Sequence, residues 1–202
     1  MEAFESFVAL ALEHADLVVS EAVKFPVCRR THKTAYEEWQ THGFEVDLVG
    51  ARAGRLVLAT VKSFLGSRGV AAEHVTGSSG GPGARLYALL NDPEIRDAVV
   101  RGACERYGYR SDEVELHLYV GKFAAPHTGH HERDIREWCA SQVVGAGSIR
   151  VVGLRDVAVI ARQVAQSKTY RDNAALMAIK VLDAADMLRP VTDPQGLTGE
   201  SC

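Results

Sequence analysis

The chain has 202 residues, 47% of them hydrophobic and 24% charged, which is typical of one globular domain with a substantial core. No apolar run approaches the roughly 20 residues that a membrane helix needs, and the acidic residues at both ends of MEAFESFVALALEHAD argue against a signal peptide. The formal net charge of −3 counts against a generally polyanion-binding surface, because nucleic acid is bound through Lys and Arg.

The N-terminal third predicts a helix and then a strand. Apolar residues recur at three- and four-residue spacing over 3–15, which favours an amphipathic helix. Residues 16–27 are rich in valine and alternate loosely, so they predict a strand that ends at Pro26. The polar stretch 31–42 is compatible with a short helix or an ordered loop.

A hairpin follows in residues 43–64. Val46, Leu48 and the run VLATV have β character, and Ala53-Gly54 supplies a tight turn between two strands. The glycine-rich stretch 66–85, with SSGGPGAR, predicts a flexible loop.

The second half alternates helices and strands. Pro93 near the start and Gly108 at the end delimit one helix of this series. The expected elements are a helix at 91–108, a strand at 114–123, a helix at 130–142, a strand at 148–154 and a helical stretch at 156–188 with a break near 167–169. This order predicts an α/β fold with a central mixed β-sheet flanked by helices. We expect a single domain over residues 1–189 and a flexible tail over 190–202.

An acid and a lysine stand on neighbouring strands of the hairpin. Asp47 lies near the end of the first strand and Lys62 near the end of the second. Side chains alternate across a strand, so Glu45 is expected to share a face with Asp47, and Thr60 with Lys62. If these faces coincide, Asp47 offers an oxygen ligand for Mg²⁺ or Mn²⁺, and Glu45 and the Val61 carbonyl are further candidate ligands.

Lys62 is the candidate catalytic residue beside this metal. It follows the apolar run VLATV, where a buried lysine needs a partner. Its ammonium could orient or deprotonate an attacking water, or stabilise charge on a phosphate, while Asp47 and Glu45 complete the catalytic set. The alternative is a solvated basic face, since five of the six charged residues between Arg52 and Arg85 are basic.

The segment EVDLVGARAGRLVLATVKSF, residues 45–64, resembles the PD-(D/E)xK nuclease superfamily, which has the restriction-endonuclease-like fold. Members carry an acid at the end of one strand and an acid-x-Lys triplet on the next, and Asp47 and Lys62 match the first acid and the lysine. The order of elements over residues 3–154 agrees too. The resemblance implies a single restriction-endonuclease-like domain and a metal-dependent DNA endonuclease that hydrolyses phosphodiester bonds, and duplex cutting would suit a homodimer.

Thr60 departs from the family pattern because it occupies the place of the second acid. A neutral hydroxyl is a poor metal ligand beside a carboxylate. Glu45, Glu21, Glu5 and Glu13 are candidate replacements. The alternative function is therefore a catalytically degenerate nuclease-fold module that binds nucleic acid or a protein partner.

Two further patterns involve cysteine. Cys28, Cys104, Cys139 and Cys202 are widely spaced without a CxxC pair, which favours reduced thiols and a cytoplasmic location. His127, His130 and His131 precede Cys139 and are conceivable zinc ligands, but their spacing matches no established zinc signature. A histidine-rich loop that leads into a helix usually provides polar capping and solvent contact, and this is the expected role of these residues.

Overall fold

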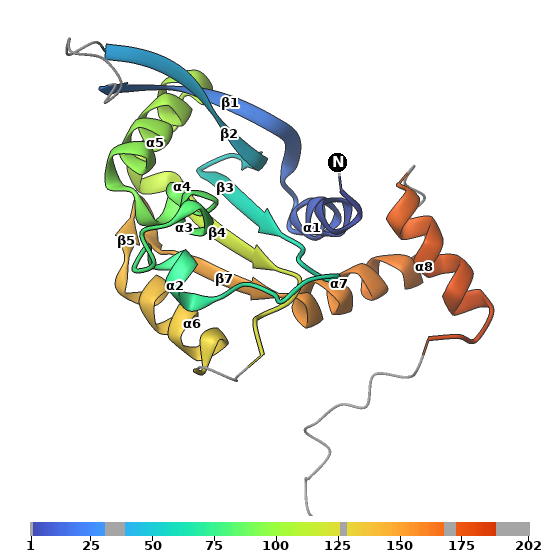
Figure 1. Cartoon of the computed structure of the whole chain (residues 1–202). Helices are drawn as coiled ribbons and strands as arrows, with labels where there is room; N and C mark the ends of the chain where they lie inside the picture. Colours follow the sequence, from blue (N-terminus) through green and yellow to red (C-terminus); the bar gives the residue numbers. More distant parts are fainter. Residues whose placement is uncertain (1, 31–38, 126–128, 168–172, 189–202) are drawn as a thin grey trace, which may run out of the picture.

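The protein, seen here in a computed structural model that describes residues 2–30, 39–125, 129–167 and 173–188, has a five-stranded sheet with helices on both faces (Figure 1). This confirms the predicted α/β class with a mixed central sheet. The spatial order of the strands is β1-β2-β3-β4-β7. Their bounds are β1 Val18–Arg30, β2 Trp39–Arg52, β3 Arg55–Lys62, β4 Val114–Val120 and β7 Arg150–Gly153.

Strand direction changes in the middle of the sheet. β1, β2 and β3 are antiparallel neighbours, and the β2–β3 turn uses Gly54 at a φ of 69°. β3, β4 and β7 are parallel, so long connections that contain helices join them. The carboxyl ends of β3, β4 and β7 therefore lie along one edge of the sheet. A small hairpin that the sequence did not predict pairs β5 (Val143–Val144) with β6 (Gly147–Ser148).

Helices from the two ends of the chain cover one face of the sheet, and helices from its middle cover the other (Figure 1). On the first face lie α1 (Ala3–His14) and α7 (Leu154–Gln166), and α8 (Ala174–Ala184) packs against both of them. The other face carries α2 (Ala72–Val75), α3 (Pro82–Arg85), α4 (Ala88–Asn91), α5 (Pro93–Tyr107), the 3-10 turn η1 (Ser111–Glu113) and α6 (His131–Ser141). No helix in the described ranges is long and apolar enough to cross a membrane.

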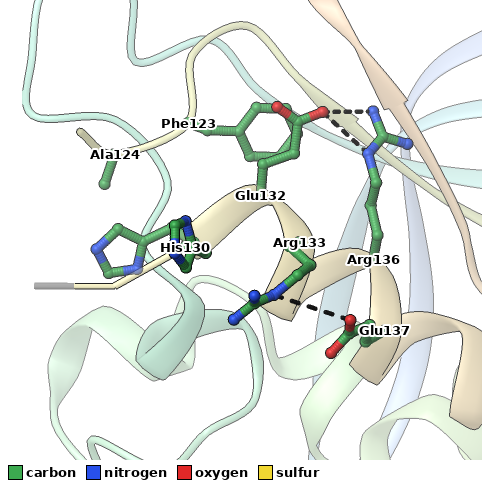
Figure 2. A pocket seen from close by; sticks show the side chains of 8 residues that line it. Phe123, Ala124, His130, Glu132, Arg133, Arg136 and Glu137 are labelled. Atoms are coloured by element: carbon green, nitrogen blue, oxygen red, sulfur yellow. Dashed lines mark hydrogen bonds and ion pairs between the residues drawn. The ribbon is translucent and has the colours of Figure 1, made fainter. Parts of the chain in front are cut away.

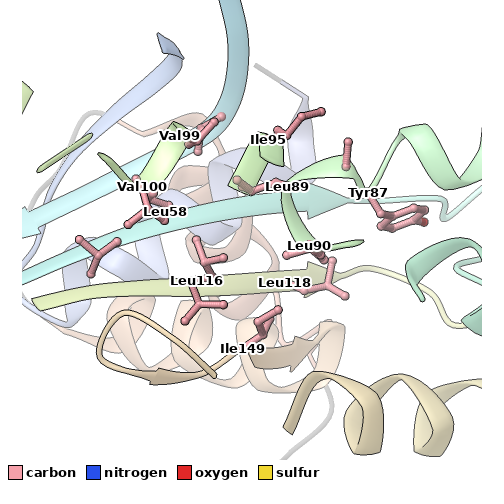
Figure 3. Close-up of a cluster of buried hydrophobic side chains, with 14 of the residues drawn as sticks. Leu58, Tyr87, Leu89, Leu90, Ile95, Val99, Val100, Leu116, Leu118 and Ile149 are labelled. Atoms are coloured by element: carbon pink, nitrogen blue, oxygen red, sulfur yellow. The ribbon is translucent and has the colours of Figure 1, made fainter. Parts of the chain in front are cut away.

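The main core lies between the sheet and the helices from the middle of the chain (Figure 3). Leu58, Leu116 and Leu118 are inaccessible to solvent because β3 and β4 are the inner strands of the sheet. Burying each leucine contributes about 2 kcal/mol in transfer free energy. A second core on the other face holds α1 against Leu48, and this double-sided burial fixes the β2–β3 hairpin in place.

Pro26 does not end the first strand, contrary to the prediction. β1 continues through it to Arg30, in register with the first residues of β2. In the described sheet, strand β1 has no neighbour on its other side, and an edge strand tolerates a residue without an N–H group. Residues 39–42 also belong to β2 instead of a helix or loop, while residues 31–38 lie outside the described ranges.

The glycine-rich stretch is folded, which corrects the prediction of a flexible loop. Short helices α2 and α3 form within it, and Val70 and Val75 are fully buried. The Asn91 amide donates hydrogen bonds to the carbonyls of His74 and Ala84, both at 3.0 Å, so it ties the two helices together. The predicted break after α7 is confirmed, and the predicted tail over 190–202 lies outside the described residues.

Candidate functional site

Asp47 lies at a fork where β2 leaves β3. The two strands are paired from Leu48 opposite Ala59 to the turn, and the rest of β2 pairs only with β1. The last residues of β3, from Thr60 to Lys62, continue beside β4. The fork therefore exposes the edge of β3 next to Asp47.

One carboxylate oxygen of Asp47 accepts hydrogen bonds from three consecutive residues at the end of β3. Its Oδ2 accepts hydrogen bonds from the Val61 amide at 2.6 Å, the Thr60 hydroxyl at 3.1 Å and the Lys62 ammonium at 3.4 Å. The side chains of Lys62 and Asp47 are 18% and 21% exposed, so the ion pair is enclosed but reachable from solvent. The structure thus brings together the predicted acid and lysine, with Thr60 between them.

The carbonyl of Val61 faces the same fork. In a β-strand the N–H and C=O of one residue point to the same edge. The Val61 N–H points to Asp47, whereas the Lys62 carbonyl accepts a hydrogen bond from Gly121 on the β4 side at 2.9 Å. The Val61 carbonyl is therefore on the open edge beside Asp47.

Glu45 does not accompany Asp47 as expected from its position in the strand. It pairs with Lys24 at 3.5 Å on the β1–β2 ribbon, and its side chain is half exposed. Side chains of β2 do not alternate regularly between the two faces of the sheet around Asp47. Val46 and Val49 both face the larger core, although residues three apart on a regular strand face opposite sides. The break coincides with a positive φ of 49° at Ala22 on the opposite strand.

The other candidate acids lie on two elements, Glu21 on β1 and Glu5 and Glu13 on α1. Glu21 is exposed on β1, and Glu5 accepts a hydrogen bond from the Glu2 amide at the start of α1. Glu2 itself, which the sequence analysis missed, accepts a 2.9 Å hydrogen bond from Ser63, the residue after Lys62. The Glu-x-x-Glu spacing of Glu2 and Glu5, which is typical of a helix start, could have indicated that Glu2 is held in place by the first turn of α1.

The residues at the fork do not fit a resident Mg²⁺ or Mn²⁺ ion. Within the described ranges, no three His, Cys, Asp or Glu side chains gather where they could hold a metal. Among those same residues, Asp47 is the only carboxylate in contact with Thr60 and Lys62, and three donors already occupy its Oδ2. Divalent cations prefer several oxygen ligands, and here a hydroxyl replaces the second acid.

A pocket of about 510 Å³ lies beside β2, the strand that carries Asp47. Phe44 lines it and precedes Asp47 by three residues, roughly 10 Å along β2. The pocket walls also carry Arg29, which is ion-paired with Asp92, and the exposed Arg85. Three glycines of the folded glycine-rich stretch are also part of the lining: Gly77, Gly80 and Gly81.

A second pocket, of about 560 Å³, opens beside α6 (Figure 2). Its basic groups are largely neutralised, because Arg136 bonds Glu132 at 2.8 Å and Arg133 lies 3.8 Å from Glu137. The Arg136 guanidinium also lies over the Phe123 ring, 5.8 Å from its centroid. This pocket therefore offers little net positive charge.

The conceivable zinc cluster is not assembled among the described residues. Cys139 is fully buried in the apolar core, where burial raises the pKa of its thiol to about 12. His131 Nδ1 lies 3.2 Å from the Ala72 amide, which donates to it, and 3.7 Å from Glu73. His130 lies at the second pocket, and His127 is outside the described residues.

The chain matches no protein-family model, no curated protein and no solved structure. Its function must therefore be inferred from these side chains, since a fold by itself does not specify an activity.

A cluster of charged and polar groups lies away from the fork, on β3 and β4, with His117 buried and Arg55 and Glu115 partly exposed. Glu115 receives two hydrogen bonds from Arg55, at 2.7 and 2.8 Å, and lies 2.8 Å from His117 Nε2. Hydrogen bonds from His117 and Arg55 lower the pKa of Glu115 to about 2. Burial lowers the pKa of His117 and raises that of Tyr119, whose hydroxyl is 3.3 Å from His117 Nδ1, to about 12.

This cluster makes stability depend on pH. His117 is ordinarily half-protonated at 6.5, so below that pH the unfolded chain takes up a proton that the folded chain resists, and the free energy of unfolding falls. Glu115 contributes to the free energy of unfolding above pH 4.5, its ordinary pKa, and this contribution is lost as the pH falls towards 2. Urea denaturation at pH 7, 5 and 3 should show decreasing stability, with a smaller loss between pH 7 and 5 in His117→Gln. An equal loss in that variant would contradict this assignment.

Proposed function

We propose that this chain is a nucleic-acid-binding module on a nuclease-like fold, and that as it stands it does not hydrolyse its ligand. The observation that carries the proposal is the hydrogen bonding at the fork, where Thr60, Val61 and Lys62 all donate to one carboxylate oxygen of Asp47. A nuclease of the resembled family would need a second acid at Thr60. We therefore keep the DNA binding that the sequence predicts and leave out the cleavage step.

Lys62 can exchange its partner for a phosphate. Its ammonium is a compact charge with three donors, and its 3.4 Å separation from Asp47 is longer than a strong charge-assisted hydrogen bond. Because this ion pair is partly exposed, separating it for a phosphate oxygen does not leave a charge in a dry interior. Asp47 then acts as a resting counter-ion that keeps Lys62 oriented.

The pocket beside Phe44 supports a bound strand. Arg85 provides positive charge, while Arg29 is paired with Asp92 at the same pocket, and the partly exposed Phe44 ring provides a surface for a base. Base stacking on an aromatic ring contributes about 1–3 kcal/mol per base and tolerates any sequence. Single-stranded nucleic acid is the ligand that this combination of charge and ring fits best.

Binding is tested with fluorescently labelled single-stranded and duplex DNA at several salt concentrations. Lys62→Ala and Arg85→Ala should each weaken single-strand binding about three- to tenfold and reduce the salt slope by about 0.7, because each removes one phosphate contact. Arg110→Ala is the matched control, since Arg110 is 78% exposed and pairs with Asp112 at the other end of β4.

Metal-dependent endonuclease activity remains the second candidate, favoured by the Val61 carbonyl on the edge next to Asp47. Incubation of the unmodified chain with supercoiled, linear and branched DNA and Mg²⁺ or Mn²⁺ decides between them. Cutting that Lys62→Ala abolishes would establish the nuclease. Equal DNA affinity in Lys62→Ala, Arg85→Ala and the unmodified chain would refute the binding site itself.

A further inference from the structure

The carboxyl ends of the three parallel strands lie in register at one edge of the sheet. Lys62, the last residue of β3, is aligned with Val120 of β4, and Val120 is aligned with Gly153 of β7. In Figure 1 the arrowheads of these strands point to the same side of the molecule, where α7 begins. Adjacent strands are about 4.8 Å apart, so the three strand ends span about 10 Å. In α/β sheets, ligands bind at the carboxyl ends of parallel strands.

Three cations follow these strand ends. Lys122 and Arg155 each come two residues after the aligned ends of β4 and β7, and Arg68 is on the loop that follows β3. All three residues are exposed, and no ion pair joins any of them to an acid in the described part of the chain. The Lys122 ammonium donates a hydrogen bond at 2.7 Å to the Ser67 carbonyl, which is neutral. The three positive charges are therefore available to an anion.

The loops after β3 and β4 are joined through their backbones. Val70 and Phe123 form a parallel bridge, in which the Val70 amide donates to the Lys122 carbonyl at 2.8 Å. Gly69 has a φ of 94°, and a Cβ there would lie 2.6 Å from the carbonyl of Phe123. The backbone that carries Arg68 and Lys122 is thus held in place without a ligand, which lowers the entropy cost of binding one.

Four acids near these strand ends already have partners: Asp47, Glu132, Asp156 and Glu2. The first two form ion pairs with Lys62 and Arg136. The other two lie at helix starts, Asp156 in the first turn of α7 and Glu2 at the start of α1, where the helix dipole stabilises a negative charge. None of the four is ion-paired with the three cations.

We propose that the sugar-phosphate backbone of a single nucleic-acid strand crosses this edge from Lys62 over Lys122 and Arg68 to Arg155. The inference rests on the nucleic-acid binding proposed above, and it extends the contact at Lys62 across β4 and β7. A free phosphate is too small to reach cations at three strand ends, whereas a span of about 10 Å accommodates about two or three consecutive phosphates of a strand. Such contacts position the strand without reading its bases.

Affinity for a labelled oligothymidine of about 12 nucleotides, measured at several salt concentrations, tests the proposal. Arg68→Ala, Lys122→Ala and Arg155→Ala should each weaken binding about three- to tenfold and reduce the salt slope by about 0.7. The triple variant should reduce the slope by about 2, because the three contacts are separate. Lys122→Arg keeps the charge and should bind as the unmodified chain does.

A second triple variant matches the change in net charge. Arg101→Ala, Arg110→Ala and Arg150→Ala together remove three exposed arginines from α5, from the turn before β4 and from the start of β7. These positions lie away from the carboxyl edge, so this control should bind the oligothymidine within about twofold of the unmodified chain. Thermal denaturation of both triple variants verifies that they are folded.

Lysine acetylation provides a measurement without any substitution. The oligothymidine should slow acetylation of Lys122 at least threefold, as followed by mass spectrometry. Lys180 is the matched control, since it also donates to a backbone carbonyl, that of Ser167 at 3.1 Å, but lies on α8. Equal acetylation of Lys122 with and without the oligothymidine would contradict the proposed path.

The variants separate this path from the proposed function. Unchanged affinity in the Arg68/Lys122/Arg155 variant, with weaker binding in Lys62→Ala, would overturn the path and leave the proposed function in place. An equal loss in the two triple variants would also overturn it, because net charge alone would then explain the loss. If neither Lys62→Ala nor the Arg68/Lys122/Arg155 variant changes the affinity, the path and the proposed binding site are both wrong.

Discussion

Thr60→Glu is expected to bind Mn²⁺ and to gain thermal stability from it, whereas the unmodified chain does neither. The substitution places a second carboxylate next to Asp47, so two acids repel each other until a cation joins them. At 100 times its dissociation constant, a ligand that binds only the folded chain adds about 2.7 kcal/mol, or roughly 5–10 °C in Tm for a domain of this size. Mg²⁺-dependent DNA cutting is expected to appear with it.

Two further variants make the Thr60→Glu result interpretable. Thr60 is only 6% exposed, so the longer side chain can disturb packing, and Thr60→Asp offers the acid at nearly the size of threonine. The Thr60→Glu/Asp47→Asn double variant has a single acid and should lose both the Mn²⁺ shift and the cutting. Folded acid variants without any Mn²⁺ effect would show that the fork departs from the metal-binding geometry of the nucleases it resembles.

Gly121→Ala is expected to cost about 3 kcal/mol or more in the free energy of unfolding. A Cβ at this position would lie 2.3 Å from the Ser63 carbonyl oxygen and 3.0 Å from two more backbone atoms of Ser63. Backbone cannot rotate away as a flexible side chain can, so the ends of β3 and β4 must move apart. That movement also breaks the hydrogen bond that the Gly121 amide donates to the Lys62 carbonyl, and it displaces the Lys62–Asp47 pair.

Urea denaturation of Gly121→Ala measures the loss, and Gly66→Ala serves as its control. Gly66 has an ordinary φ, and a Cβ added there would meet no described atom within 4 Å, so its stability should change by about 0.5 kcal/mol or less. Equal stabilities of the two variants would mean that β3 and β4 separate here without cost.

Local chemistry made most of the fold predictable. Asp92 caps α5 by accepting from the Glu94 and Ile95 amides, and Gly108 closes the same helix at a φ of 76°. Such signals lie within a few residues of one another, so a single sequence contains them. The folded glycine-rich stretch was missed because its order comes from Val70, Val75 and Asn91, which make contacts with segments distant in the sequence.

The candidate site was predictable only in part, for a related reason. Asp47 and Lys62 meet as expected, because the tight turn makes their strands antiparallel neighbours. Glu45 fails to join them because the alternation of side chains along β2 breaks opposite Ala22 of β1. The sequence of β2 does not indicate that Ala22 has a positive φ. The Arg55–Glu115–His117 cluster depends on the β3–β4 pairing, which joins residues about 60 positions apart.

Pro26 on strand β1 has a consequence for how the molecule avoids self-association through its sheet. The outer side of an edge strand is a template on which another chain can add a strand, and this is a common start of aggregation. Proline has no N–H to offer to an incoming strand, and Lys24 adds a charge two residues before it. The residue that was expected to end a strand therefore makes the outer side of this 13-residue strand a poorer template for an added strand.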